Sequence, residues 1–349
     1  MSPRVTVLMS TYNGEKYLRE SIESVLNQTF SDFEFLIIDD ASTDSSQDII
    51  NNYNDPRIIL IENKDNIGQA ESLNRGLREA KGDYIGRMDQ DDLSLPQRVE
   101  KQVHFLDEHP EIGVCGTFIS FIDDNNLHRY HSYLRDPMIG SNELKAQLLF
   151  SPCFIHPTVM IRTSLLRKYD LAYNKNFEPA EDYWMWHELS SVTEFCNIPE
   201  KLLKLREHNR QRSIIDKRKQ ISGADIIRKQ TLKSFVNDKL TENFESRFMM
   251  ISRFEHLNEL SDLRDAEECL SSLLEINQTK CRYDQNALKM VLSLVWYYLC
   301  MNSTHLGLRI LKKYYLSPLF CIKGNFYQHL KFLVKCILKF KVRLPQLSI

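Results

Sequence analysis

Hydrophobic positions in the first 120 residues change their spacing along the chain. Short apolar runs, typical of buried strands, lie at 5–10, 33–38, 58–61 and 84–88. Between them apolar residues recur every three or four positions, as in Leu18, Ile22 and Val25, which predicts helices that pack by one face. Further helices are expected at about 68–80 and from Pro96 onward. Strands that alternate with helices predict an α/β fold with a mostly parallel sheet and helices on both faces.

The rest of the chain is less regular and then becomes helical. A strand is expected over His156–Ile161 and a helix over Trp184–Leu189, and the pattern beyond Arg212 is mostly helical. We therefore expect a domain over residues 1–215, followed by a mostly helical C-terminal region over residues 216–349.

Polar clusters follow three of the predicted strands. They are Thr11-Tyr12-Asn13-Gly14, Asp39-Asp40 and Asp89-Gln90-Asp91-Asp92. Parallel sheets bind ligands at the carboxyl ends of their strands, so we expect all three clusters on one rim. Asp39 or Asp40 can accept hydrogen bonds from a base or a ribose, or can simply cap the helix that follows.

The cluster Asp89-Gln90-Asp91-Asp92 contains three carboxylates, which repel one another unless a cation compensates. Oxygen ligands of this kind suit Mn²⁺ or Mg²⁺. The alternative is an acidic surface loop, in which Asp92 caps the helix that starts near Pro96. Neither a glycine-rich dinucleotide motif nor a phosphate-binding Gly-Lys-Ser/Thr motif occurs, so a metal is expected to neutralise any diphosphate.

Two other groups of residues are candidates for chemistry. Glu181-Asp182 precedes a run of aromatic residues that includes Trp184, where a carboxylate can have a raised pKa and act as a base, or can merely complement a helix dipole. His208 is either a third metal or phosphate ligand or a solvated loop residue, and His156 is either structural or part of an acceptor pocket.

Charge is unevenly distributed along the 349 residues. The formal net charge is −2, which gives no strong field towards nucleic acid, so no nucleic-acid partner is expected. Residues 287–349 nevertheless carry ten Lys or Arg and no Asp or Glu. The eight cysteines lack metal-site spacing, and the N-terminus lacks an apolar leader, which favours a reducing, cytoplasmic setting.

The basic C-terminal stretch has two interpretations. It is a helical subdomain packed on the rest of the chain, or an interfacial segment on an anionic membrane surface at the inner face of the plasma membrane, and we favour a mixture. The best spanning candidate, Met290–Met301, is too short to cross a bilayer. An apolar helix face is expected from Leu330, Phe332, Leu333, Cys336, Ile337 and Phe340, with Lys331, Lys335 and Lys339 on another face.

In order and spacing, several of these motifs resemble family 2 glycosyltransferases of the bacterial polysaccharide and lipopolysaccharide type. The resemblance covers roughly residues 4–215, and it rests on Val5–Asn13, Ser24–Phe30, Phe35–Asp40, Asn66–Gly68, Leu73–Gly76, Gly82–Asp92, His156–Arg162 and Glu181-Asp182. It implies a GT-A fold, an inverting mechanism and a nucleotide-diphosphate sugar donor, most often a UDP-sugar. A hexosyl or N-acetylhexosaminyl group would pass to a saccharide or lipid-linked saccharide during cell-surface polysaccharide synthesis.

The resemblance also implies roles for individual residues. Those expected at the nucleotide sugar are Thr11, Tyr12, Glu15, Asp39, Asp40, Asn66, Asp89 and Gln90. Among them Asp40 matches the acid that contacts uracil or ribose. Asp89 and Asp91 match the family's Asp-x-Asp, with Asp91 as a direct metal ligand, and Asp182 beside Glu181 matches the catalytic base. His208 matches a metal-site histidine, although Leu205 stands where the family has an aromatic residue. His156 and Trp184 are expected at the acceptor.

Three other functions compete with this interpretation. A sugar-nucleotide-binding protein without transferase activity would keep the acidic residues but would not need Asp182. A nucleotidyltransferase usually opens with a glycine-rich loop that contains Arg or Lys, whereas Ser10–Gly14 holds one glycine. A membrane scaffold would leave the clustered acids unexplained.

Overall fold

The structure is a computed structural model, and it describes residues 2–129, 138–255, 257–320 and 326–339. The chain divides into two compact units. Unit 1 comprises Met1–Ser141 and Pro152–Ala224, and unit 2 comprises Asn142–Ser151 and Asp225–Ile349. The functional division at residue 215 stays a prediction.

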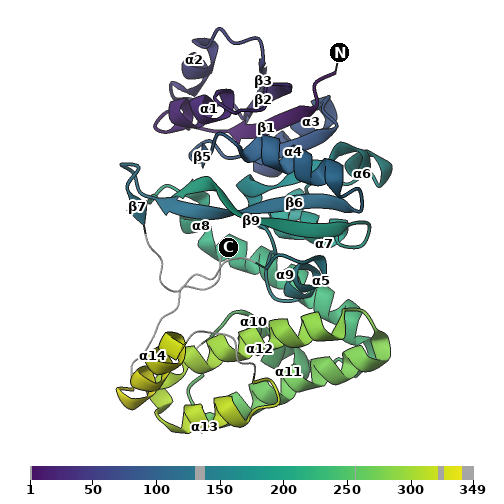
Figure 1. Cartoon of the computed structure of the whole chain (residues 1–349), viewed down its shortest axis with the longest axis vertical. Coiled ribbons are helices and arrows are strands. Elements are labelled where there is room, and N and C mark those ends of the chain that lie inside the picture. The colour runs from purple at the N-terminus through teal and green to yellow at the C-terminus, as the bar shows by residue number, and fades with distance from the viewer. Residues whose placement is uncertain (1, 130–137, 256, 321–325, 340–349) are drawn as a thin grey trace. The chain divides into compact units, whose positions relative to one another are not determined.

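A mixed β-sheet forms the centre of unit 1 (Figure 1). Its strands within the described residues are β1 (Val5–Thr11), β2 (Phe33–Asp39), β3 (Ile58–Glu62), β4 (Tyr84–Met88), β5 (Leu93–Ser94), β6 (Ile112–Ile122), β7 (His128–Arg129), β8 (Met160–Arg162) and β9 (Glu194–Arg206). They lie in the order β3-β2-β1-β4-β8-β6-β9-β5, and β7 pairs with β6. The first four strands of this order are parallel, as the strand-helix alternation predicts. Beyond them β8 runs antiparallel to both β4 and β6, which makes the sheet mixed.

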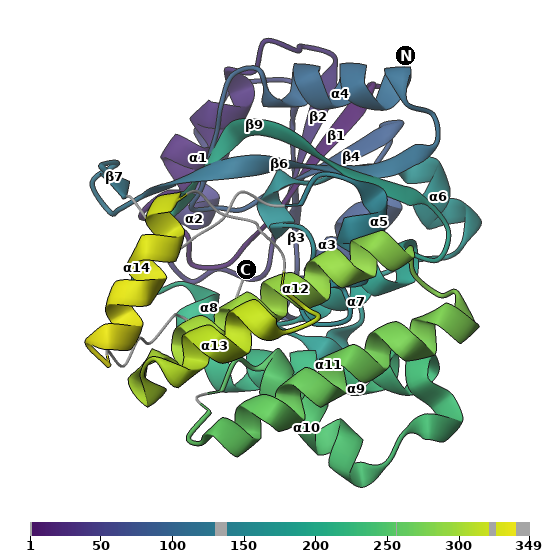
Figure 2. The ribbon, with the colours of Figure 1, turned by 60° about the horizontal axis from the view of Figure 1, so that its bottom comes forward.

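Helices cover both faces of this sheet. In unit 1 they are α1 (Leu18–Leu26), α2 (Ser46–Asn51), α3 (Gln69–Glu79), α4 (Arg98–Glu108), α6 (Thr163–Lys168), α7 (Glu181–Leu189) and α8 (Arg212–Ile215), with short 3-10 turns at His156–Thr158 and Lys175–Phe177. Val5, Val7 and Met9 point into a core shared with α1 and α4, because alternate side chains of a strand face opposite ways. Leu8 faces α3, where a Cβ on Gly76 would lie 2.2 Å from its Cδ1. The glycine therefore allows α3 to pack closely, on the side of the strands opposite α4 (Figure 2).

The strand expected over His156–Ile161 is only partly present. Residues His156–Thr158 form a 3-10 turn, and β8 begins at Met160. Pro157 lacks an N–H and has a fixed φ, so it suits a turn better than a ladder between two strands. The prediction of a strand start at His156 was therefore wrong by four residues.

The register of the parallel strands brings their carboxyl ends together. Thr11 at the end of β1 pairs with Asp39 at the end of β2, and Met9 pairs with Met88 at the end of β4. The three polar clusters predicted from the sequence therefore start from neighbouring strand ends, on one rim of the sheet.

Unit 2 is helical. Its helices are α5 (Ser141–Gln147), the later part of α9 (Lys217–Val236), α10 (Glu242–Ser252), α11 (Leu260–Lys280), α12 (Gln285–Asn302), α13 (Arg309–Leu316) and α14 (Phe326–Ile337), with 3-10 turns at Asn237–Lys239 and Thr304–Leu306. The segment 142–151 belongs here because Phe150 packs against Phe248, with ring centroids 5.3 Å apart, and its carbonyl accepts a bond from Arg228. The apolar run at Met290–Met301 lies in α12 and is largely buried in this unit. Within the described residues no helix combines the length and the apolar character needed to span a bilayer.

Candidate active site

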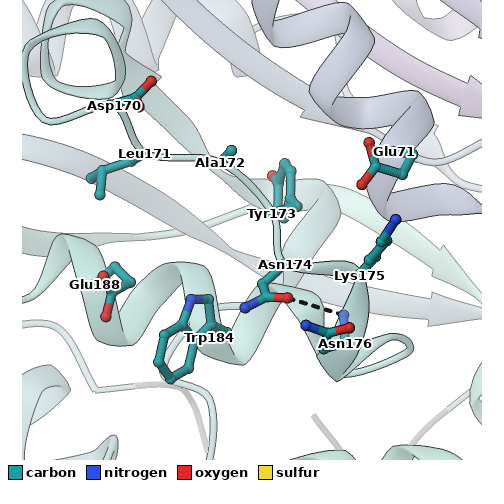
Figure 3. Close-up of a pocket in the computed structure, with 10 residues that line it drawn as sticks. All are labelled: Glu71, Asp170, Leu171, Ala172, Tyr173, Asn174, Lys175, Asn176, Trp184 and Glu188. Carbon is teal, nitrogen blue, oxygen red and sulfur yellow. Dashed lines mark hydrogen bonds between the residues drawn. The ribbon is translucent and has the colours of Figure 1, made fainter.

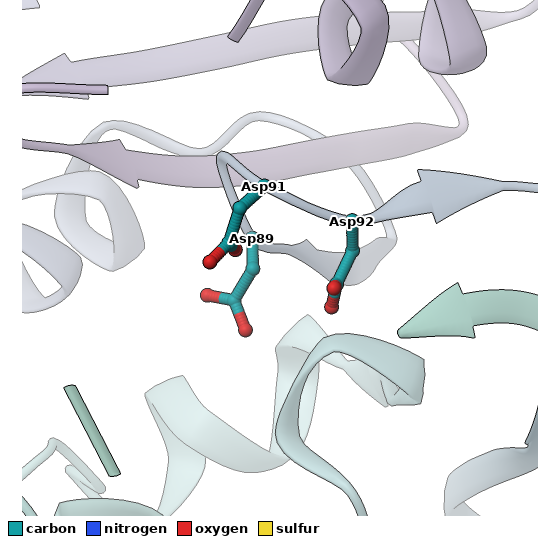
Figure 4. A group of neighbouring side chains, drawn as sticks. All are labelled: Asp89, Asp91 and Asp92. Atoms are coloured by element: carbon teal, nitrogen blue, oxygen red, sulfur yellow. The ribbon is translucent and has the colours of Figure 1, made fainter. Parts of the chain in front are cut away.

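Three carboxylates converge in the loop that follows β4. Asp89, Asp91 and Asp92 each offer an oxygen atom, and these atoms lie within 4.8 Å of one another (Figure 4). Burial raises the pKa of Asp92 well above its usual value, and the charges of Asp91 and Asp89 raise it further. Burial also raises the pKa of Asp89, against the opposing charge of Arg87. Hard oxygen donors packed in this way fit a divalent cation such as Mg²⁺ or Mn²⁺.

Two buried arginines hold this loop in place. Arg87 on β4 forms an ion pair with Asp89 at 2.6 Å. At the end of β9, the backbone N–H of Arg206 donates to Asp92 at 2.9 Å, and its Nε donates to the carbonyl of Asp91 at 2.8 Å. Asp92 therefore anchors the loop to β9. The alternative in which it caps the next helix is wrong, because the N-cap of α4 is Gln97 and no side chain of the described residues caps it. Arg87 was missed, although a charge inside the otherwise apolar strand Tyr84–Met88 was a signal for it.

His208 lies beside the carboxylates, 117 positions further along the chain than Asp91. Its Nε2 is 2.8 Å from Asp91 Oδ2, and its Nδ1 accepts a bond from the backbone N–H of Arg210 at 3.2 Å. In the neutral ring the proton is therefore on Nε2, which donates to Asp91. To coordinate a cation through Nε2, His208 would have to take the other tautomer, with its proton on Nδ1, and give up its bonds to Asp91 and to the Arg210 backbone N–H.

Gln90 joins the carboxylate loop to the loop after β1. Its Oε1 accepts bonds from the Thr11 hydroxyl at 2.6 Å and from the Tyr12 backbone at 2.9 Å. A Cβ on Gly14 would lie 2.5 Å from the same oxygen, so a larger residue at position 14 would displace the Gln90 side chain. The Tyr12 side chain is 46% exposed above this junction.

The loop after β1 also interlocks with the loop after β2. The backbone N–H of Glu15 donates to Asp44 at 3.1 Å, and the Glu15 carboxylate accepts from Ser45 at 3.2 Å. Asn13 has a positive φ of 51° and accepts a bond from Thr43 at 2.8 Å. Asn66, also predicted at the donor, is exposed on the next loop.

Asp39 and Asp40 are both buried but differ in their partners. Asp40 accepts from the backbone N–H groups of Ile67 and Gly68, both at 2.9 Å, and from Asn63 at 2.8 Å, so both of its oxygens are engaged. Asp39 uses only Oδ2, which accepts from Ser42 and Gln47. Its Oδ1 is buried and has no hydrogen-bond partner among the described residues.

Glu181 and Asp182 open α7. Burial raises the pKa of Asp182 to about 6, and the negative charge of Asp89 adds to the rise. A hydrogen bond from the Tyr183 backbone N–H opposes this rise. The Asp89 and Asp182 carboxyls therefore influence each other, although they come from different elements. Burial raises the pKa of Glu181 to about 8, and in the described part of the chain its Oε2 meets no hydrogen-bond partner.

His156 contacts Tyr173 directly, and Trp184 lines the same hollow as Tyr173. His156 Nε2 is 2.8 Å from the Tyr173 hydroxyl, and burial with the charge of Arg87 lowers the pKa of His156 well below its usual value, so the ring is neutral. Trp184 stacks on Phe177 at 4.5 Å between ring centroids. It lines a hollow of about 390 Å³ together with Glu71, Asp170, Leu171, Ala172, Tyr173, Asn174, Lys175, Asn176 and Glu188 (Figure 3).

Arg212 was not anticipated from the sequence. It forms ion pairs with Glu178 and Asp216 and donates to Gln69 Oε1 at 2.8 Å. Its charge lowers the pKa of both Asp89 and Glu181, though less than burial raises them. A lone arginine in a basic segment gave no signal of this proximity.

Known proteins share both the sequence and the fold. The family model described as Glycosyl transferase family 2 matches residues 6–170. The Escherichia coli O-antigen biosynthesis glycosyltransferase WbnJ is 32% identical over 249 residues, which are 67% of this chain and 92% of WbnJ. The chain belongs to glycosyltransferase family 2.

Solved structures add the fold to this family 2 assignment. Staphylococcus aureus TarS, residues 1–349 in complex with UDP-GlcNAc, superposes with a TM-score of 0.55 at 18% identity, over 84% of this chain and 87% of that one. The mannosyltransferase PcManGT from Pyrobaculum calidifontis, in complex with GDP-Man and Mn²⁺, gives 0.51 at 18% identity, over 85% and 88%. The expected GT-A fold with a helical C-terminal region is confirmed, and this family 2 member is a glycosyltransferase.

Proposed function

We propose that this protein is an inverting, metal-assisted glycosyltransferase that uses a nucleotide-diphosphate sugar, specifically a UDP-sugar. The observation that carries the proposal is the three-carboxylate cluster, whose member Asp89 also raises the pKa of the separate carboxyl Asp182. One group of acids is suited to a cation and the other to a proton, as transfer from a sugar diphosphate to a hydroxyl requires. The UDP-GlcNAc and GDP-Man complexes of the structural neighbours support the donor class.

Asp89, Asp91 and Asp92 are the proposed cation ligands, with His208 as a further ligand in the tautomer that carries its proton on Nδ1. Mn²⁺ or Mg²⁺ bound there would supply positive charge for the leaving diphosphate. Arg87 already neutralises part of the charge of Asp89, so Asp91 is the direct ligand that we favour. Gln90, Thr11 and Tyr12 hold the adjoining loops in position.

Asp182 is the proposed base. With a pKa of about 6, it is mostly ionised at neutral pH yet basic enough to take a proton from an acceptor hydroxyl. Glu181, with a pKa of about 8, stays mostly protonated beside it and so adds little negative charge. A single displacement with Asp182 as base would invert the anomeric centre.

We assign the base or ribose contact to Asp39 in preference to Asp40. Oδ1 of Asp39 is a buried acceptor for which the described ranges offer no partner, and such an atom is costly unless a ligand donates to it. Both oxygens of Asp40 already bind the loop that leads to α3. Glu15 and Asn66 remain proposed donor contacts at the edge of the rim.

The hollow beside Trp184 is the proposed position of the acceptor saccharide. An indole beside asparagines and carboxylates suits a sugar, which has apolar ring faces and hydroxyl edges. His156 would act through Tyr173, which it holds by a hydrogen bond and which also lines the hollow. A lipid-linked saccharide, used at the cytoplasmic face of the plasma membrane, completes the proposal.

A panel of nucleotide sugars, assayed with Mn²⁺ for donor hydrolysis and for thermal stabilisation, tests this function. We expect one UDP-sugar to be hydrolysed slowly and to stabilise the fold. Stabilisation without hydrolysis, or without transfer to any saccharide, would favour a sugar-nucleotide-binding protein. Failure of every donor to stabilise the protein would refute the proposal.

A further inference from the structure

Helix α14 carries apolar side chains on two separate faces. Phe332 is 0% exposed and Cys336 is 1% exposed, and the Phe332 ring packs 5.3 Å from that of Tyr314 on α13. Five other apolar residues point to solvent, and their exposures are 44% for Leu330, 37% for Leu333, 43% for Val334, 56% for Ile337 and 58% for Leu338. Their spacing puts them on one side of the helix, as a continuous outer stripe. Of the apolar face predicted from the sequence, Phe340 lies outside the described residues.

The outer stripe is part of a local concentration of exposed apolar surface. Sixteen large apolar side chains are exposed among the described residues, and eight of them lie between positions 308 and 338. The patch extends onto α13, because the Tyr315 hydroxyl is 3.1 Å from His329 Nδ1 and the next residue, Leu316, is 73% exposed. Exposed apolar residues that occur singly need no explanation, but a contiguous patch of this kind marks an interaction surface.

Positive charge borders the outer stripe. At 100° per residue Lys331 and Lys335 fall between the outer stripe and the buried side of α14, and Lys339 follows the end of the helix. The sequence has no Asp or Glu after Asp284, so no later acid offsets these lysines. Long lysine side chains can keep their charge at a polar boundary while the neighbouring apolar groups are buried.

We propose that the outer stripe of α14 is a membrane-binding face, which enters the interface of a bilayer that contains anionic lipids. The five apolar side chains lie among the upper acyl chains, and Lys331 and Lys335 reach lipid phosphates. A second copy of this chain fits the same face poorly, because two such helices side by side would bring their lysines together. The inference uses only the geometry of unit 2 and does not depend on which donor or acceptor unit 1 uses.

The test is co-sedimentation of the full chain with vesicles of phosphatidylcholine alone or mixed with phosphatidylglycerol. We expect binding to the mixed vesicles that weakens with added salt, and much weaker binding to the neutral ones. The double variant Leu333→Ser/Ile337→Ser should lower the binding to mixed vesicles by about tenfold or more. The matched control is Ile226→Ser, a change at an equally exposed apolar residue of unit 2.

The charge is tested separately with Lys331→Gln and Lys335→Gln, and Lys233→Gln on α9 is the control. Each of the first two should weaken binding to the mixed vesicles by about fivefold and leave the neutral vesicles unaffected. Donor hydrolysis measured without vesicles should be unchanged in all variants, which separates this inference from the catalytic proposal. Wild-type binding by the double variant would overturn the inference. The inference would also be overturned if the wild type formed a dimer and bound no vesicles, and if the double variant abolished that dimer. The face would then contact protein.

Discussion

The rim of unit 1 and the outer stripe of unit 2 each hold side chains in an environment that is unfavourable for an isolated fold, but of opposite kinds. The rim gathers three carboxylates within 4.8 Å, where an isolated fold would place apolar or neutral groups. The outer stripe exposes five apolar side chains that an isolated fold would bury. The rim is braced by Arg87 and Arg206, whereas the stripe has lysines only along its border. The two features fit the two proposed ligands, a cation at the rim of unit 1 and anionic lipid at the outer stripe of unit 2.

The largest test of this comparison is at Asp182. Asp182→Asn keeps the shape of the side chain but removes the proton acceptor, so turnover should fall by about 10³-fold. The dissociation constant of the donor should change little, because Asp182 is not among the proposed donor contacts. Steady-state kinetics with calorimetric binding of the donor measures both. Turnover close to that of the wild type would show that another group is the base.

The cation site should give the next largest effect. Mn²⁺ at about a hundred times its dissociation constant should stabilise the fold by about 2.7 kcal/mol, and a chelator should reverse this. Asp91→Asn should remove most of that stabilisation, while Asp65→Asn, at an exposed acid of the loop between β3 and α3, should keep it. Thermal unfolding with and without Mn²⁺ is the measurement. Equal stabilisation of both variants would argue against a site at Asp91.

Asp40 and Asp39 should separate stability from donor binding. Asp40→Ala leaves the backbone N–H groups of Ile67 and Gly68 without an acceptor, so the free energy of unfolding should fall by about 2–3 kcal/mol. Asp39→Asn should lower donor affinity by about tenfold, since a charged acceptor becomes neutral, with a smaller loss of stability. Denaturant unfolding and donor titration of both variants give the comparison. The reverse pattern would restore Asp40 as the nucleotide contact.

The smallest effect concerns pH and Glu181. In the folded state the pKa of Glu181 is about 8, above the ordinary value of 4.5. The contribution of Glu181 to stability is therefore fully present below pH 4.5 and is lost as the pH rises towards 8. Glu181→Gln removes this titration. Between about pH 5 and pH 8 the unfolding temperature should therefore fall less in the variant than in the wild type. Calorimetry at both pH values measures the difference, and parallel changes in the two proteins would contradict the assignment.

Much of the rim follows from sequence because the fold obeys a general rule. Apolar runs with helical stretches between them predict parallel strands, and parallel strands carry their following loops to one edge. That argument alone placed Thr11, Asp39 and Asp89 near one another. It did not reach the second half of the sheet, where β8 and β9 arrive by longer connections and where Pro157 moves the start of β8.

The apolar face of α14 shows where sequence reasoning stops. Helical spacing predicted that Phe332, Cys336, Leu333 and Ile337 share a face, but the structure buries the first two and exposes the others. Periodicity fixes the direction in which each side chain leaves the helix. Which of those directions meets a neighbour depends on α13 and α12, whose packing the spacing does not contain.

For this protein the sequence by itself determined the family, the α/β order of the elements and which residues are able to bind ligands or transfer protons. The tertiary structure decided how those residues are paired. It joined His208 to Asp91 and tied Asp92 to Arg206. Within the part of the chain that the structure describes, it left one oxygen of Asp39 without a partner while it engaged both oxygens of Asp40. The physical reason is that residue type and spacing are local properties, whereas burial, hydrogen-bond partners and pKa depend on segments that meet only when the chain folds.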